Sequence, residues 1–161
     1  MKTLLLFQSV TKTYKYPLTR STEISNMLDE IITTRYSSSK FSLWGEKQAI
    51  PGHWQFYTKR YGFPTSLSAK GGKLSVTAEI GDHHFLLKAT AGVNLSFLIL
   101  FYIGAAGLIL TSLGIGLPRS ILTLLFWCGF LAAVFLLDKL NKKILLALLE
   151  RYIPPTRPIT K

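Results

Sequence analysis

Charged side chains are missing from two long stretches of this 161-residue chain. None occurs between Ala89 and Pro118, and after Arg119 none occurs between Ser120 and Leu137. A helix of about 20 apolar residues crosses the hydrocarbon core of a bilayer, and about 17 can suffice. The sequence therefore predicts a transmembrane hairpin with helices over about 93–113 and 120–137. The alternative is a pair of core helices in a soluble protein, but such helices normally keep a polar face, which neither stretch has.

Residues that carry catalysis or bind metals are also scarce. The single cysteine, Cys128, lies inside the second apolar stretch, which excludes an intrachain disulfide. The three histidines, at 53, 83 and 84, are accompanied by no cysteine or carboxylate cluster of the kind that metal sites need. No G-x-S-x-G motif or phosphate-binding loop is present. We therefore expect a protein that is not an enzyme, with no catalytic residue, no metal and no cofactor.

Negative charge is in short supply at both ends of the chain. The net charge is +11; residues 1–90 hold twelve Lys and Arg against six Asp and Glu, and residues 138–161 hold six against two. Segments rich in Lys and Arg next to membrane helices stay in the cytoplasm. The pattern predicts a multi-pass protein of a bacterial cytoplasmic (inner) membrane with both termini in the cytoplasm.

The first ninety residues show the patterns of a small α+β domain. Apolar residues at 24, 27, 28, 31 and 32 predict an amphipathic helix over about 21–34. Strand patterns cover about 4–16, 40–45, 54–59, 67–69, 74–80 and 85–89. We therefore expect an antiparallel sheet with one covering helix over 1–90, the transmembrane hairpin over 91–137, and a basic amphipathic helix with a proline-rich tail over 138–161.

A few aromatic and glycine positions carry a family resemblance. Phe41 with Gly45, Trp54 with Phe56, and the Gly71-Gly72 pair are followed closely by the paired apolar helices. In this the chain resembles small uncharacterised bacterial membrane proteins, common in Bacteroidota, with an α+β domain before a transmembrane hairpin. The resemblance implies an architecture and brings no catalytic residue with it.

Small residues recur on one side of each predicted membrane helix. Their spacing places them on common helix faces, and close approach of backbones over small residues is how membrane helices associate. Two interpretations stay open: the faces dock another membrane protein, or they pack on each other within the hairpin. The residues expected to pack are Gly104, Gly107, Thr111 and Gly114 on the first helix and Gly129 and Ala133 on the second.

Basic residues on two segments predict a surface for anionic lipid or for a partner. One set is Lys139, Lys142 and Lys143, at the start of the C-terminal amphipathic helix; the other is Lys59, Arg60 and Tyr61. Cations beside a membrane attract anionic headgroups, and this accounts for the charge without nucleic acid, which we do not expect as a partner. The C-terminal helix either lies in the headgroup region or packs on the open face of the sheet.

These features together predict an accessory or scaffold subunit of the membrane. The lipid bilayer and either another membrane protein or a second copy of the chain are the expected partners, bound in part at the cytoplasmic face. A small pore-forming or membrane-perturbing protein, like a holin or a toxin component, is the alternative. A membrane-bound enzyme would require His53, His83 or His84 to meet a carboxylate in space.

Overall fold

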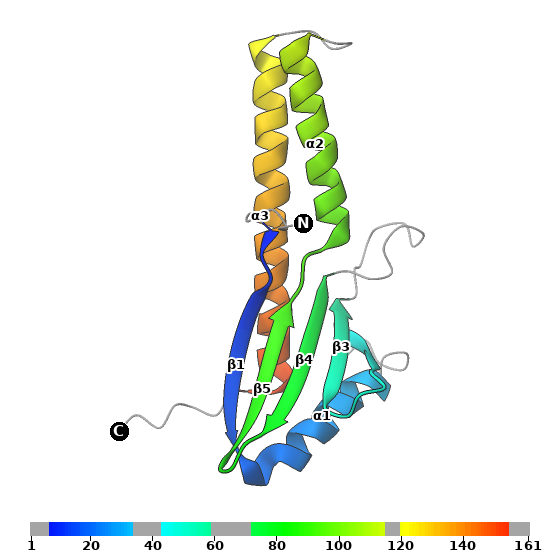
Figure 1. Cartoon of the computed structure of the whole chain (residues 1–161), viewed down its shortest axis with the longest axis vertical. Coiled ribbons are helices and arrows are strands. Elements are labelled where there is room, and N and C mark those ends of the chain that lie inside the picture. The colour runs from blue at the N-terminus through cyan, green and yellow to red at the C-terminus, as the bar shows by residue number, and fades with distance from the viewer. Residues whose placement is uncertain (1–6, 34–42, 59–71, 115–119, 155–161) are drawn as a thin grey trace, which may run out of the picture. The chain divides into compact units, whose positions relative to one another are not determined.

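The chain folds into two compact units. The computed structural model describes residues 7–33, 43–58, 72–114 and 120–154 (Figure 1). The first unit comprises residues 1–8 and 93–141, and the second comprises residues 9–92 and 142–161. The protein is α+β, as predicted, and its described residues form one five-stranded antiparallel sheet and three α-helices.

The sheet of the second unit has the strand order β1-β5-β4-β3-β2, and all its neighbouring pairs are antiparallel. The strands are β1 (Val10–Pro17), β2 (Leu43–Lys47), β3 (His53–Thr58), β4 (Lys73–Ile80) and β5 (His84–Ala91). The short 3-10 helix η2 (Leu18–Arg20) leads from β1 into α1 (Ser21–Thr33), which occupies the predicted helix position. The strand predicted around 67–69 lies outside the described residues, as does Gly71 of the expected hairpin.

One face of the sheet is buried because apolar residues alternate with polar ones along each central strand. Leu74 and Val76 of β4 and Leu87 and Ala89 of β5 are fully buried. They form one core with Ile24, Leu28 and Ile31 of α1. Figure 1 shows α1 on the far side of the sheet, which leaves the near face of the strands in view.

Helix α3 (Ile121–Tyr152) is a single helix of 32 residues. The expected division at Leu137, between a membrane helix over 120–137 and the helix of the segment 138–161, is therefore not a break in the helix. The charged stretch after Leu137 does not interrupt the helix because Lys, Leu and Glu are all good helix formers, and neither glycine nor proline occurs between Phe130 and Ile153. The helix ends just before Pro154 and Pro155, which cannot continue it.

The end of α3 belongs to the core of the sheet. Leu145, Leu149 and Ile153 are at most 2% exposed and pack in the same cluster as the buried strand residues. Of the two alternatives for the C-terminal helix, the structure shows packing on the sheet, but on the face that α1 also covers and not on the open face that was expected. Only the exposed side of this segment is left for contact with anything else.

Polar contacts fasten the end of α3 to β1. The Tyr14 hydroxyl donates a hydrogen bond to Glu150 Oε1 at 2.9 Å, and Lys12 Nζ forms an ion pair with the same oxygen. The Tyr16 hydroxyl donates to the Ile153 carbonyl at 3.3 Å. Burial is the main reason why the pKa of Tyr16 is raised to about 12. The hydrogen bond from Lys12, followed by that from Tyr14, holds the pKa of Glu150 below its ordinary value, against the opposing effect of burial.

The first unit contains α2 (Leu95–Leu113) and the first part of α3. The Asn94 side chain caps α2 by accepting a hydrogen bond from the Ser96 amide at 3.0 Å. Gly114 ends the helix in the left-handed region, at φ +70°, where a residue without a side chain is favoured. Phe7 packs edge-to-face on Phe101 of α2, with ring centroids 5.1 Å apart.

Truncating a core residue at the end of α3 should destabilise the second unit. Leu149→Ala removes a side chain that is 1% exposed, and we expect a loss of about 2–5 kcal/mol in unfolding free energy. Ile144→Ala is the matched control, because Ile144 lies on the same helix and is 45% exposed. Thermal unfolding of the full chain in detergent, followed by circular dichroism, measures both. Equal melting temperatures for the two variants would contradict the packing of α3 on the sheet.

The contacts of Glu150 should make stability depend on pH. Its pKa is lower in the folded protein than its ordinary value of 4.5, so the stabilisation is present above that pH and is lost as the pH falls through the folded pKa. We expect Glu150→Gln to destabilise the protein at pH 7 and to weaken the loss of stability under acid. In a Lys12→Met background the same substitution should have a smaller effect. Melting temperatures at neutral and acid pH for the four proteins test this; parallel curves would refute it.

Candidate functional site

Both helices of the first unit expose most of their apolar residues. Within the described residues, α2 and α3 are the two helices long and apolar enough to cross a membrane. Only 22% of the most apolar stretch of α2, and 11% of that of α3, is buried within the protein. A core helix of a soluble protein is mostly buried, whereas these two helices leave most of their apolar surface uncovered by the described part of the protein. Such a surface is typical of a helix in contact with lipid or with another protein.

The small residues of α2 lie against aromatic side chains of α3. A Cβ atom placed on Gly104 would come within 2.7 Å of the Phe130 ring, and one on Gly107 would come within 2.5 Å of the Trp127 ring. Thr111, one turn further along α2, is fully buried. Two of the predicted packing residues of α2, Gly104 and Gly107, therefore lie in the contact between the two helices, Thr111 is buried, and Gly114 serves as the helix C-cap.

The small pair on α3 does not take part in this contact. A Cβ atom on Gly129 would have no neighbour within 4 Å, and Ala133 is exposed. Gly104 and Gly107 of α2 thus lie against α3, and docking of another membrane protein stays a prediction. The Gly129 and Ala133 face of α3 is uncovered in the described part of the chain.

The predicted basic surface is only partly present on the described residues. Lys139 and Lys143 are exposed one helical turn apart on α3, and Lys139 Nζ lies 4.7 Å from the centre of the Phe135 ring. Lys142 is only 2% exposed and so contributes no surface, because it falls on the buried side of α3. Lys59, Arg60 and Tyr61 lie outside the described residues.

The outer face of the sheet, opposite α1 and the core, is polar and faces the reader in Figure 1. It is formed by the alternate residues that do not enter the core. Cross-strand neighbours on this face include Thr11 with Thr90, whose hydroxyl oxygens are 3.1 Å apart, and Thr77 with both Lys88 and His53. The charged members of the face are Lys15, Lys73 and Lys88 against Glu46 and Glu79.

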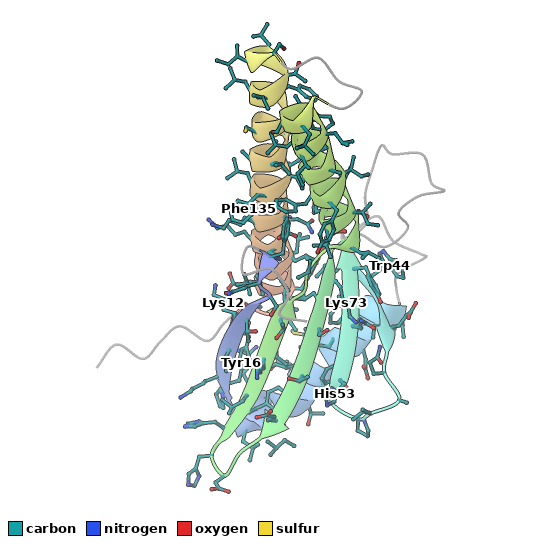
Figure 2. All side chains as sticks on the ribbon, turned by 45° about the horizontal axis from the view of Figure 1, so that its top comes forward. Lys12, Tyr16, Trp44, His53, Lys73 and Phe135 are labelled. Atoms are coloured by element: carbon teal, nitrogen blue, oxygen red, sulfur yellow. The ribbon has the colours of Figure 1, made fainter. Side chains whose placement is uncertain are left out.

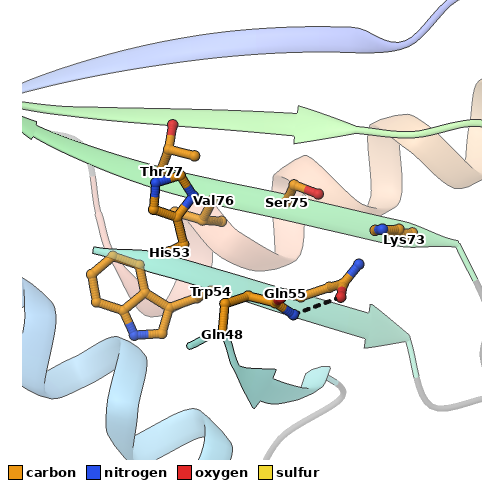
Figure 3. A pocket seen from close by; sticks show the side chains of 8 residues that line it. All are labelled: Gln48, His53, Trp54, Gln55, Lys73, Ser75, Val76 and Thr77. Carbon is orange, nitrogen blue, oxygen red and sulfur yellow. Dashed lines mark hydrogen bonds between the residues drawn. The ribbon is translucent and has the colours of Figure 1, made fainter. Parts of the chain in front are cut away.

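A shallow depression lies on this face along β3 and β4 (Figure 3). It encloses about 180 Å³ and is lined by Gln48, His53, Trp54, Gln55, Lys73, Ser75, Val76 and Thr77. Gln48 Nε2 donates a hydrogen bond to Gln55 Oε1 at 2.8 Å, which holds both amides at its edge. Amides, hydroxyls and one ammonium group suit hydrogen bonding to a polar or anionic group, and no carboxylate occurs among these lining residues.

Two aromatic side chains stand beside Lys73 at one end of the outer face. Trp44 of β2 and Tyr57 of β3 are cross-strand partners with ring centroids 4.9 Å apart, and Tyr57 is in turn the partner of Lys73. Figure 2 shows Trp44 and Lys73 toward one end of the sheet and His53 toward the other. The period-two pattern places Trp44 and Tyr57 on the face opposite the core residues Leu43 and Phe56, but only the register of β2 and β3 brings the two rings together.

The histidines are spread over different places. His53 begins β3, His83 lies in the turn before β5, and His84 begins β5 opposite Pro17. Within the described ranges, no three His, Cys, Asp or Glu side chains gather as a group able to hold a metal ion. The expectation of a protein without catalytic residues stays a prediction.

The close contact at Gly107 should make the helix pair sensitive to one methyl group. Gly107→Ala would force the Trp127 ring to move, at a cost of about 1–3 kcal/mol that outweighs a helix-propensity gain of up to about 1 kcal/mol. Gly129→Ala is the matched control, since its new methyl group has open space and only the propensity gain applies. Thermal unfolding in mild detergent should show a lower midpoint for the first variant and an unchanged or higher midpoint for the second. The reverse order would refute the packing of α2 on α3.

Comparison with other proteins leaves the family of this chain open. No protein-family model, no curated protein and no solved structure matches it. The resemblance to small bacterial membrane proteins therefore stays a prediction, and a function has to follow from the residues of the chain itself.

Proposed function

We propose that this protein is a non-enzymatic accessory or scaffold subunit of a bacterial cytoplasmic membrane. In this proposal α2 and the first part of α3 cross the bilayer, both termini are cytoplasmic, and the second unit binds another membrane protein or complex through the outer face of its sheet.

Insertion into the membrane is supported by the composition and exposure of α2 and α3. The run of thirty uncharged residues from Ala89 to Pro118 contains all of α2. Large apolar side chains such as Ile99, Ile103 and Leu125 are more than half exposed. In water this surface would favour aggregation, whereas in a bilayer it meets lipid chains of the same polarity.

The observation that carries the proposed binding role is the outer face of the sheet, which none of the described helices covers. Within the described residues, the core cluster places α1 and the end of α3 on one face of the sheet. Five strands then present a broad surface of hydroxyl, amide and ammonium groups, held in register by backbone pairing on a rigid support. A protein that is anchored in the membrane and presents such a face is suited to bind another membrane protein.

The chemistry of the outer face defines the partner surface that would fit. Three lysines and two glutamates leave a slight positive excess, and the central positions carry hydroxyl groups that both donate and accept hydrogen bonds. A flat, polar, mildly acidic surface on another membrane protein is complementary to this arrangement. A second copy of the chain would instead have to place lysine opposite lysine, unless the copies were offset.

Charge reversal on the outer face tests the proposal. In membranes solubilised with a gentle detergent, a tagged full-length chain should co-purify with a defined membrane protein, and Lys88→Glu should lower the recovered amount about tenfold or more. The reason is that like charges placed opposite each other in an interface cost several kcal/mol. Asn26→Glu on the exposed side of α1 is the control and should leave the recovery unchanged.

Three outcomes would argue against this function. A strictly monomeric particle without a co-purifying protein in several detergents would contradict it, as would equal effects of the two substitutions. Leakage of dye from liposomes at low protein density would instead indicate the pore-forming alternative.

A further inference from the structure

One end of the sheet is the end from which the chain leaves for the first unit. Val10, the first residue of β1, pairs with Ala91, the last residue of β5. From Val10 the chain runs back to Phe7, and from Ala91 it runs forward to Leu95, where α2 begins. Two covalent connections between the units therefore start from the same end of the sheet.

Lys73 marks that end on β4. Its carbonyl accepts a hydrogen bond from the Gly92 amide at 2.8 Å, so Lys73 is fixed beside the last residues before α2. Three residue steps separate Gly92 from Leu95, and a fully extended chain of that length spans about 10 Å. If α2 enters the bilayer at Leu95, as the proposed function requires, this short connection limits how far the backbone of Lys73 can lie from the membrane surface.

The side chains gathered there are those that favour a membrane–water interface. The partly exposed Trp44 ring lies against the Tyr57 ring, which is only 7% exposed, and the exposed Lys73 stands next to Tyr57. Trp and Tyr concentrate at headgroup level because their rings are apolar and their N–H and O–H groups are polar. An ammonium group at this depth attracts the phosphates of anionic lipids.

Lys73 also has hydrogen-bonding neighbours suited to a phosphate. The depression on β3 and β4 places the Ser75 hydroxyl and the Gln55 amide on the same face, one step further along the strands. Both groups donate hydrogen bonds, and the residues that line the depression include no carboxylate to compete for the ammonium group. The set combines one cation with neutral donors, which is what a phosphodiester with a single negative charge requires.

We propose that the Trp44, Tyr57 and Lys73 corner, with Ser75 and Gln55 behind it, binds the phosphate headgroup of an anionic phospholipid. In this proposal Trp44, backed by the buried Tyr57 ring, sits at headgroup depth, Lys73 pairs with the phosphate, and the polar neighbours complete its hydrogen bonds. This inference rests on the membrane insertion of the proposed function but is independent of any protein partner.

Lipid retention by the full-length chain tests the site. The protein is reconstituted in nanodiscs of equal parts phosphatidylcholine and phosphatidylglycerol and extracted into mild detergent, and the retained lipids are counted by mass spectrometry. Lys73→Gln should lower the retained ratio of phosphatidylglycerol to phosphatidylcholine about fivefold, the expected contribution of one cation at the membrane surface. Lys88→Gln removes the same charge from the same face, four residues before Gly92, and should leave the ratio unchanged.

Two further measurements distinguish a membrane lipid from a soluble anion at this corner. Phosphatidylcholine brominated near the headgroup should quench the fluorescence component that Trp44→Phe removes. An excess of inorganic phosphate should not displace the retained lipid, because a soluble ion lacks the acyl chains that hold the headgroup in place.

The inference is overturned if both lysine variants lower the ratio equally, if neither does, if free phosphate displaces the lipid, or if Trp44 is not quenched. Failure of the proposed function gives a different result. Carbonate extraction would then release the wild-type chain from membranes without detergent, or the chain would retain phosphatidylglycerol through Lys73 while binding no protein.

Discussion

The packing of the last residues of α3 against the sheet is the contact on which the second unit depends. Leu145, Leu149 and Ile153 are part of the same core as the buried residues of β1 and β5. With Tyr14, Tyr16 and Lys12 holding the helix at its edge, this segment is as much a part of the domain as any strand. The domain is therefore assembled from two parts of the sequence that lie on either side of the apolar helices.

That assembly explains which features could be predicted from the sequence. The amphipathic helix from Ser21 and the strands around Val76 and Leu87 have periodic patterns that local chemistry determines, and the structure has these elements where they were expected. The continuity of α3 was not foreseen, because the change in composition at Asp138 resembles a boundary between elements. The charged residues after Leu137 favour water over lipid around that part of α3, but they do not interrupt the helix.

Side-chain placement on surfaces was harder to predict than the elements themselves. Lys142 looks like its neighbours Lys139 and Lys143 in the sequence, and only the rotation of α3 against its surroundings separates the buried residue from the exposed ones. The Trp44 and Tyr57 pair depends on the register between β2 and β3, which no local pattern determines. The Gly104 and Gly107 face was predicted from its spacing, but spacing did not distinguish it from the Gly129 and Ala133 face, which is uncovered in the described part of the chain.

The order of synthesis gives the split domain a further consequence. The five strands and α1 leave the ribosome first, and their apolar face stays incomplete until residues 142–153 have been made. Both apolar helices are translated in between. Domains made of contiguous sequence can fold as soon as they emerge, but the second unit has to wait until both apolar helices have been made. A complete fold of the second unit is therefore also a sign that α2 and α3 have been synthesised.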